Sequence, residues 1–112
     1  MTDLLARLQA ATEGSAELDA AVLRAAGWSK RDDAPQWNDQ WGNWRDMKHP
    51  SRSLDAITEL IEARRWKWES APSRGHVEYV DADGATAMFG ASHPSSPLAL
   101  CIAFVRALET AA

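Results

Sequence analysis

The chain has 112 residues, enough for one domain that buries a hydrophobic core without the help of disulfides or metal ions. Hydrophobic residues make up 46% and charged residues 25%, a composition that excludes an intrinsically disordered chain. The formal net charge is -4, so non-specific binding to nucleic acid or to an anionic membrane, which needs clustered Lys and Arg, is not expected.

The chain begins with two predicted helices, each with an apolar stripe and a capping residue. Thr2 or Asp3 caps the first helix, and Ser15 caps the second. Gly27 ends the second helix in the left-handed conformation that glycine adopts most easily. In that motif the following residue packs back onto the last helical turn, so we expect Trp28 to be structural.

Residues 29–52 show no sustained hydrophobic period and contain two prolines and one glycine. We therefore predict a Trp-rich connecting segment with at most one helical turn, and long connections in small domains often carry function. Ser53 then caps a third helix over residues 53–65. Its apolar face is formed by Leu54, Ile57, Leu60 and Ile61.

Three short stretches after this helix alternate apolar and polar residues, as half-buried strands do. They cover residues 66–68, 76–80 and 85–89, with Asp83-Gly84 as a strong hairpin signal between the last two. This pattern predicts a three-stranded antiparallel meander.

A last helix is predicted with Ser96 as its cap and Pro97 at its first position. It is apolar around most of its circumference. We expect the sheet to enclose it on one side, and other helices or a partner chain to enclose it on the other.

Together these elements predict an α+β fold in a single domain over residues 1–112, with a small antiparallel three-stranded sheet sandwiched between about four helices (α-β-α). Four strings, in order, resemble the phage ABA sandwich domain, a family of small phage and prophage proteins. The strings are DLLARLQAATEGSAELDAAVLRAAGW (3–28), HPSRSLDAITELI (49–61), WKWE (66–69) and SSPLALCIAFVRAL (95–108). The resemblance implies helices on both sheet faces and an accessory role of the kind phages use against host defences, without an established reaction.

The sequence contains no indication of export, a membrane anchor or a metal site. Cys101 is the single cysteine, so an internal disulfide is excluded, and the histidines lack the spacing of metal ligands. No apolar run approaches the roughly 20 residues of a membrane span, and the first residues lack the basic character of a signal peptide. We expect a cytoplasmic protein of the host bacterium that binds no metal or cofactor.

The start of the last helix is a first candidate site. His93, Ser95 and Ser96 have the groups that hold a phosphate or carboxylate at a helix N-terminus, although every capped helix offers some of these. No motif positions a serine nucleophile beside His93, and serines before a proline-started helix are usually caps. We therefore expect no catalysis.

The segment QWNDQWGNWRD, residues 36–46, is the second candidate. Trp37, Trp41 and Trp44 would share one face if the segment were helical, which favours core packing. Polar neighbours instead favour a binding surface on which indoles stack and amides or guanidinium groups recognise a ligand. Both alternatives stay open from the sequence. The neighbours assigned to the site are Asn38, Asn43, Arg45 and Arg52.

Three functions follow from these features. The first is a non-enzymatic phage or prophage protein that sequesters a small anionic, nucleotide-like signal. The second is an inhibitor, anti-CRISPR-like in kind, that binds a host defence protein through the Trp-rich segment. The third is a structural phage assembly protein. We also expect a homo-oligomer, with the apolar last helix at the interface.

Overall fold

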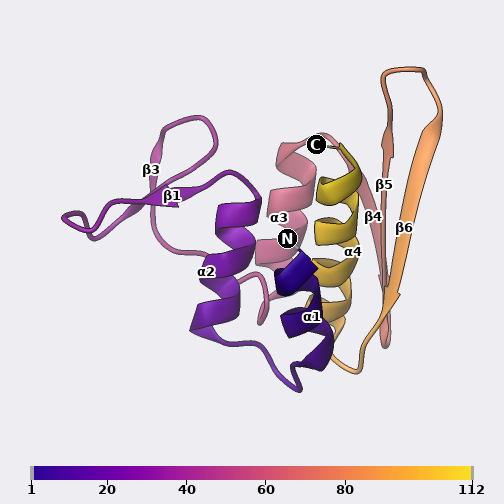
Figure 1. Cartoon of the computed structure of the whole chain (residues 1–112), viewed down its shortest axis with the longest axis horizontal. Helices are drawn as coiled ribbons and strands as arrows, with labels where there is room; N and C mark the ends of the chain where they lie inside the picture. Colours follow the sequence, from indigo (N-terminus) through magenta and orange to yellow (C-terminus); the bar gives the residue numbers. More distant parts are fainter. Residues whose placement is uncertain (1, 112) are drawn as a thin grey trace.

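The computed structural model describes residues 2–111, with the side chain of Thr2 excepted, so the cap predicted at Thr2 lies outside the described residues. Within this range the chain contains four helices and two three-stranded antiparallel sheets (Figure 1). The helices are α1 (Thr2–Ala10), α2 (Ala16–Ala25), α3 (Leu54–Ala63) and α4 (Ser96–Ala111). The first sheet consists of β1 (Ser29–Lys30), β2 (Trp37–Asn38) and β3 (Trp44–Arg45), and the second of β4 (Lys67–Ala71), β5 (Arg74–Val80) and β6 (Thr86–Ser92). The predicted α+β class is confirmed.

Local signals in the sequence fix the ends of α2. The Ser15 hydroxyl accepts a hydrogen bond from the amide of Leu18 at 3.2 Å, as an N-cap does. Gly27 has a φ of 98°, and the amide of Trp28 donates to the carbonyl of Leu23 at 2.9 Å. This is the bond pattern of a glycine-terminated helix, and it buries Trp28 to 4% exposure.

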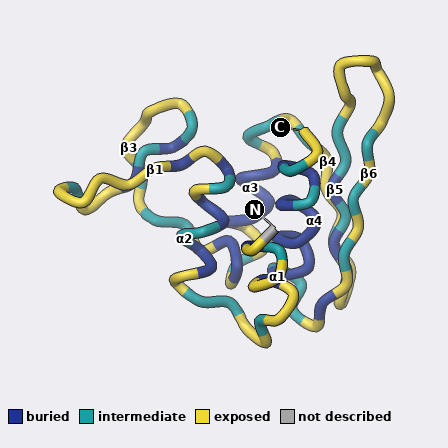
Figure 2. Tube along the Cα trace, in the orientation of Figure 1, coloured by how far each residue is buried: buried dark blue, intermediate teal, exposed yellow. Residues whose placement is uncertain are grey.

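Helix α4 forms the centre of the molecule, between β4–β5–β6 on one side and the other helices on the other (Figure 1). Its residues from Leu98 to Val105 are all buried, and the dark colour of α4 in Figure 2 follows from this. The helices therefore lie on one face of β4–β5–β6, a layering that differs from the expected helices on both faces. Within residues 2–111, no helix covers the opposite face of that sheet (Figure 1).

Gly75 on β5 lets α4 approach the sheet closely. A Cβ at this position would lie 2.7 Å from the backbone of Ala99 and Leu100 in α4. Beside this contact, the Trp66 ring stacks on Tyr79 at 4.7 Å between centroids and meets the edge of Phe104 at 6.0 Å. Trp66 thus fills the junction between the sheet and α4.

The start of α4 differs by one residue from the prediction. Ser95, rather than Ser96, is the cap, because its hydroxyl accepts the amide of Leu98 and its carbonyl accepts the amide of Ala99. Ser96 is the first residue of the helix. Among residues 2–111, no helix is both long and apolar enough to cross a membrane.

Candidate functional site

The Trp-rich segment is not a plain connection with a helical turn, as predicted, but a small antiparallel sheet. Its strands contain two residues each, in the order β1-β2-β3. Figure 1 shows that it extends away from the helices. We call residues 37–45, which comprise β2, the turn and β3, the tryptophan hairpin.

Asp39 organises the turn of the tryptophan hairpin. Its Oδ1 accepts hydrogen bonds from the amides of Trp41 at 3.0 Å and Asn43 at 2.9 Å, while its own amide donates to the carbonyl of Asn43. Gly42 has a φ of 83° and donates its amide to the carbonyl of Asp39. The backbone at the tip is therefore held by four hydrogen bonds.

The turn between β5 and β6 has the same construction. Asp81 accepts the amides of Asp83 and Ala85 at 2.9 Å each, and Gly84 has a φ of 83°. Asp-x-x-Gly-x is thus the signal that indicates the tryptophan hairpin in the sequence. It was recognisable at residues 81–85, where long alternating strands flank it, and was missed at residues 39–43.

The three tryptophans of the hairpin have three different environments. Trp37 is buried in the core, 3% exposed, with the guanidinium of Arg24 at 5.1 Å from its ring centroid. Trp41, at the turn, is 62% exposed. Trp44 is 52% exposed and pairs with Asn38 across the strands, on the face opposite to Trp37 and Arg45. They do not form one helical face, because the segment is not helical.

A groove lies between the tryptophan hairpin and α3. It has a volume of about 300 Å³, and Trp41 and Gln40 line one side of it while Glu59 and Glu62 line the other. Trp28 and Arg45 also contribute to its lining. The groove therefore combines a large exposed indole with acidic side chains of α3.

Ion pairs fix the hairpin against α3. Arg45 donates to Glu59 at 2.8 Å and contacts Asp39 at 3.5 Å, and Lys48 lies 3.2 Å from Glu59. Burial by itself raises the pKa of Asp39, but its hydrogen bonds from Asn43, Trp41 and Arg45 outweigh burial and leave the pKa below its usual range. The pKa of Glu59 is lowered in the same way, by Arg45 and Lys48 against burial. Arg45 is thus already paired.

Arg52 does not lie at the tryptophan hairpin. Its Nε and Nη2 donate to Oδ2 of the buried Asp19 at 2.9 and 2.6 Å, and Asp19 also accepts the amide and hydroxyl of Ser51. Nδ1 of His49 lies 3.3 Å from Oδ2 of Asp19 and 2.9 Å from Nη2 of Arg52. This cluster ties the segment before α3 to α2.

His93, Ser95 and Ser96 form a separate structural junction. Nε2 of His93 donates to the carbonyl of Ala11 at 2.6 Å, and Nδ1 accepts the amide of Ser95 at 2.9 Å. Both ring nitrogens are used within the chain, and His93 is 8% exposed. The residues that the sequence grouped for an anionic ligand therefore lie in three places, at the hairpin, at Asp19 and at the start of α4.

Among residues 2–111, no group of three or more His, Cys, Asp or Glu side chains is placed to hold a metal ion.

Comparisons of the chain with protein-family models, with curated proteins and with solved structures give no match. The resemblance to the phage ABA sandwich domain therefore stays a prediction.

Proposed function

We propose that the chain is a non-enzymatic binding protein that docks on a protein partner through the tryptophan hairpin. The observation that supports this is the exposure of Trp41 and Trp44, 62% and 52%, on a hairpin whose turn is held by the hydrogen bonds of Asp39 and Gly42. Exposed tryptophans on a rigid support are typical of the residues that contribute most to the affinity of protein interfaces.

The charges of the groove favour a protein over a free nucleotide. Glu59 and Glu62 line it, and Arg45 is its single basic residue and is paired with Glu59. An anionic ligand would meet the carboxylate of Glu62 there, which has no ion pair within residues 2–111, whereas a peptide segment with a basic or neutral side chain would not be repelled by it. The sequestration of a nucleotide-like signal thus has less support than the inhibitor function.

The expected homo-oligomer, with α4 at its interface, also lacks support. Helix α4 is enclosed within one chain by β4–β5–β6 and by the other helices, so it offers no apolar face to a second copy. The resemblance to the phage ABA sandwich domain favours a host defence protein as the partner of the tryptophan hairpin, in the bacterial cytoplasm.

A capture experiment tests the proposal. The full chain, the double variant Trp41→Ala with Trp44→Ala, and the control Met88→Ala are each used to capture proteins from a host lysate. Met88 is also 62% exposed but lies on β6, so it matches Trp41 in exposed apolar character alone. We expect a partner whose affinity falls by about thirtyfold or more in the double variant and is unchanged in the control.

Two results would count against this function. Retention of every partner by the double variant would exclude the tryptophan hairpin as the docking surface. Calorimetric binding of a cyclic or ADP-ribose-type nucleotide tighter than about 100 micromolar, lost in the same double variant, would instead assign the surface to a small ligand.

A further inference from the structure

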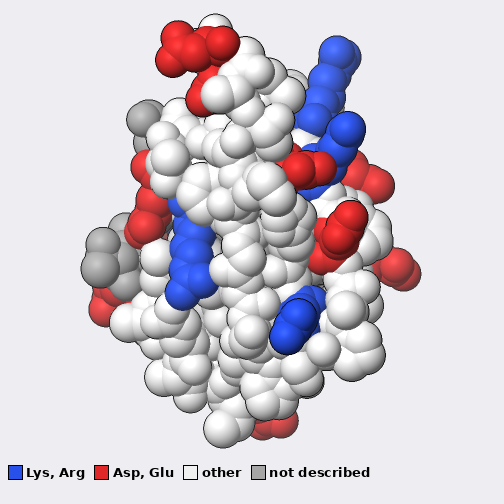
Figure 3. Space-filling model, turned by 90° about the vertical axis from the view of Figure 1, so that its right-hand side faces the viewer, with Lys and Arg blue, Asp and Glu red and all other residues white. Residues whose placement is uncertain are grey.

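The outer face of β4–β5–β6 carries a hollow that the tryptophan hairpin does not touch. Its volume is about 680 Å³, within the range of pockets that hold small organic molecules. Figure 3 views this face and shows a largely uncharged central area, with basic side chains on two sides of it and acidic side chains beside them. The lining residues used below are Glu69, Arg74, His76, Gly90, Ser92 and Arg106.

Gly90 on β6 leaves this hollow open. A Cβ at Gly90 would meet no heavy atom closer than 3.9 Å, the carbonyl oxygen of Gly75, so nothing crowds the position. Its φ is outside the left-handed region, so a side chain is compatible with the backbone there. Gly75, by contrast, is required by the close approach of α4. Packing and backbone conformation therefore do not explain the glycine at residue 90.

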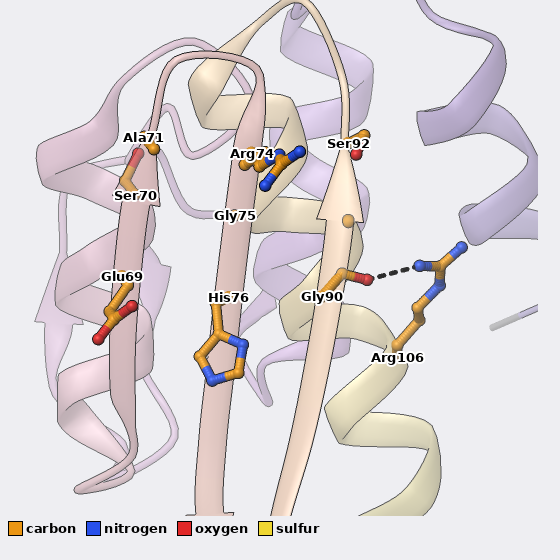
Figure 4. A pocket seen from close by; sticks show the side chains of 10 residues that line it. Glu69, Ser70, Ala71, Arg74, Gly75, His76, Gly90, Ser92 and Arg106 are labelled. Atoms are coloured by element: carbon orange, nitrogen blue, oxygen red, sulfur yellow. Dashed lines mark hydrogen bonds between the residues drawn. The ribbon is translucent and has the colours of Figure 1, made fainter.

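Two arginines from different elements border the space above Gly90. Nη1 of Arg106, which extends from α4 past the edge of β6, donates to the Gly90 carbonyl at 2.8 Å (Figure 4). Arg74 on β5 extends toward β6, where Ser92 is its cross-strand partner. Within residues 2–111 neither arginine has an ion pair. Guanidinium groups that have no carboxylate partner and lie beside a hydroxyl suit a phosphate or carboxylate group.

The one acid that lines the hollow lies away from this point. Glu69 on β4 is the cross-strand neighbour of His76 on β5, and His76 is the cross-strand neighbour of Gly90 on β6. Glu69 is thus two strands from Gly90, about 10 Å between backbones, and charges at that distance are largely screened at physiological salt. When His76 is left out of the count, the residues that line the hollow have a net charge of +1, because Arg74 and Arg106 stand against Glu69. The whole chain has a net charge of -4.

We propose that this hollow is a binding site for a small organic molecule with one oxyanion group, a phosphate or a carboxylate. Arg74, Ser92 and Arg106 bind the oxyanion group over Gly90. The uncharged remainder of the ligand lies toward β4, beside His76. Because the site is exposed, its binding is salt-dependent and of modest affinity.

Calorimetric titrations with phenyl phosphate, phenylacetate and inorganic phosphate test this site. We expect saturable binding of phenyl phosphate or phenylacetate, and the one that binds identifies the oxyanion. Inorganic phosphate binds more weakly than phenyl phosphate, since it lacks the part that covers the hollow. Arg74→Gln weakens the binding by about fivefold to tenfold, as the loss of a charge-assisted hydrogen bond does. Arg31→Gln, at an exposed loop arginine paired with Asp33, leaves it unchanged.

The variant Gly90→Val tests the need for free space over residue 90 without changing the charge of the site. It keeps both arginines, places a β-branched side chain in a strand where nothing crowds it, and occupies the space directly over residue 90, where the oxyanion group would lie. We expect a folded variant, by circular dichroism, that no longer binds the probe. The proposal is overturned if no probe gives saturable binding up to 10 millimolar, or if Arg74→Gln and Gly90→Val both bind as the natural chain does.

Discussion

Asp19 on α2 is a fully buried carboxylate that joins α2 to the segment before α3. Its Oδ1 accepts hydrogen bonds from the amide of Ser51 at 2.8 Å and from the hydroxyl of Ser51 at 2.6 Å. Its Oδ2 accepts two bonds from the Arg52 guanidinium. Asp19→Ala removes these acceptors and leaves their donors in place, so we expect it to destabilise the fold strongly.

The size of the loss follows from the burial of each donor. Ser51 is fully buried, and each of its two bonds to a charged acceptor contributes about 1.5–3 kcal/mol. The side chain of Arg52 is 44% exposed and can be hydrated again, so its ion pair adds no more than about 1 kcal/mol. These losses share one carboxylate and are not additive, which gives a free energy of unfolding lower by about 3–5 kcal/mol.

Urea denaturation followed by circular dichroism measures this loss, as a lower midpoint at an unchanged slope. Asp33→Ala is the control, because Asp33 is 70% exposed in its pair with Arg31, and we expect a change within about 0.5 kcal/mol. Asp19→Asn keeps an acceptor for Ser51 and should give an intermediate loss, which stays measurable if the alanine variant does not fold. A loss below about 1 kcal/mol for Asp19→Ala would refute the reasoning.

Four further predictions follow from the burial of single groups. Trp37→Ala should lower the free energy of unfolding by about 3–5 kcal/mol, whereas Trp41→Ala should change it by less than about 0.5 kcal/mol, and equal losses in urea denaturation would contradict the assignment of one indole to the core. Gly75→Ala should lower the thermal midpoint clearly, because its Cβ meets the backbone of α4; an unchanged midpoint would show that α4 can move away. Burial raises the pKa of the Cys101 thiol, so a thiol reagent should modify it only in urea, and rapid modification of the native chain would contradict its burial. The pKa of Asp39 is lowered in the folded state, so its contribution to stability is complete above the unfolded value of about 3.9 and is lost as the pH falls through the folded value. The tryptophan fluorescence of the hairpin should therefore change below about pH 4, and Asp39→Asn should remove that change.

Features that depend on neighbouring residues were predictable from the sequence. The caps at Ser15 and Ser53 use amides three residues away, and the end of α2 uses Gly27 and the residue after it. The meander was predictable because its strands are long enough to alternate, and the hairpin turn at residues 81–85 has its own signal. In each case the physical cause lies within five residues of its effect.

Features that depend on distant contacts were not predictable. Arg52 binds a carboxylate 33 residues away, and His93 binds a carbonyl 82 residues away, so neither was recognised as structural. The tryptophan hairpin has strands of two residues, which are too short to show a period of two. The enclosure of α4 by the sheet on one side was correctly expected from its apolar circumference, but that pattern does not decide between other helices and a partner chain on the other side.

The separation of Trp37 from Trp41 and Trp44 gives the hairpin its functional meaning. Trp37 anchors it in the core, and Asp39 fixes its turn, so the hairpin is held without any contribution from the two exposed indoles. Two indoles exposed on one small domain favour aggregation unless a partner covers them. Because the turn that carries Trp41 is already ordered, a partner that binds it loses little conformational entropy in doing so. The same hydrogen bonds that make the hairpin fold therefore make it suitable for binding.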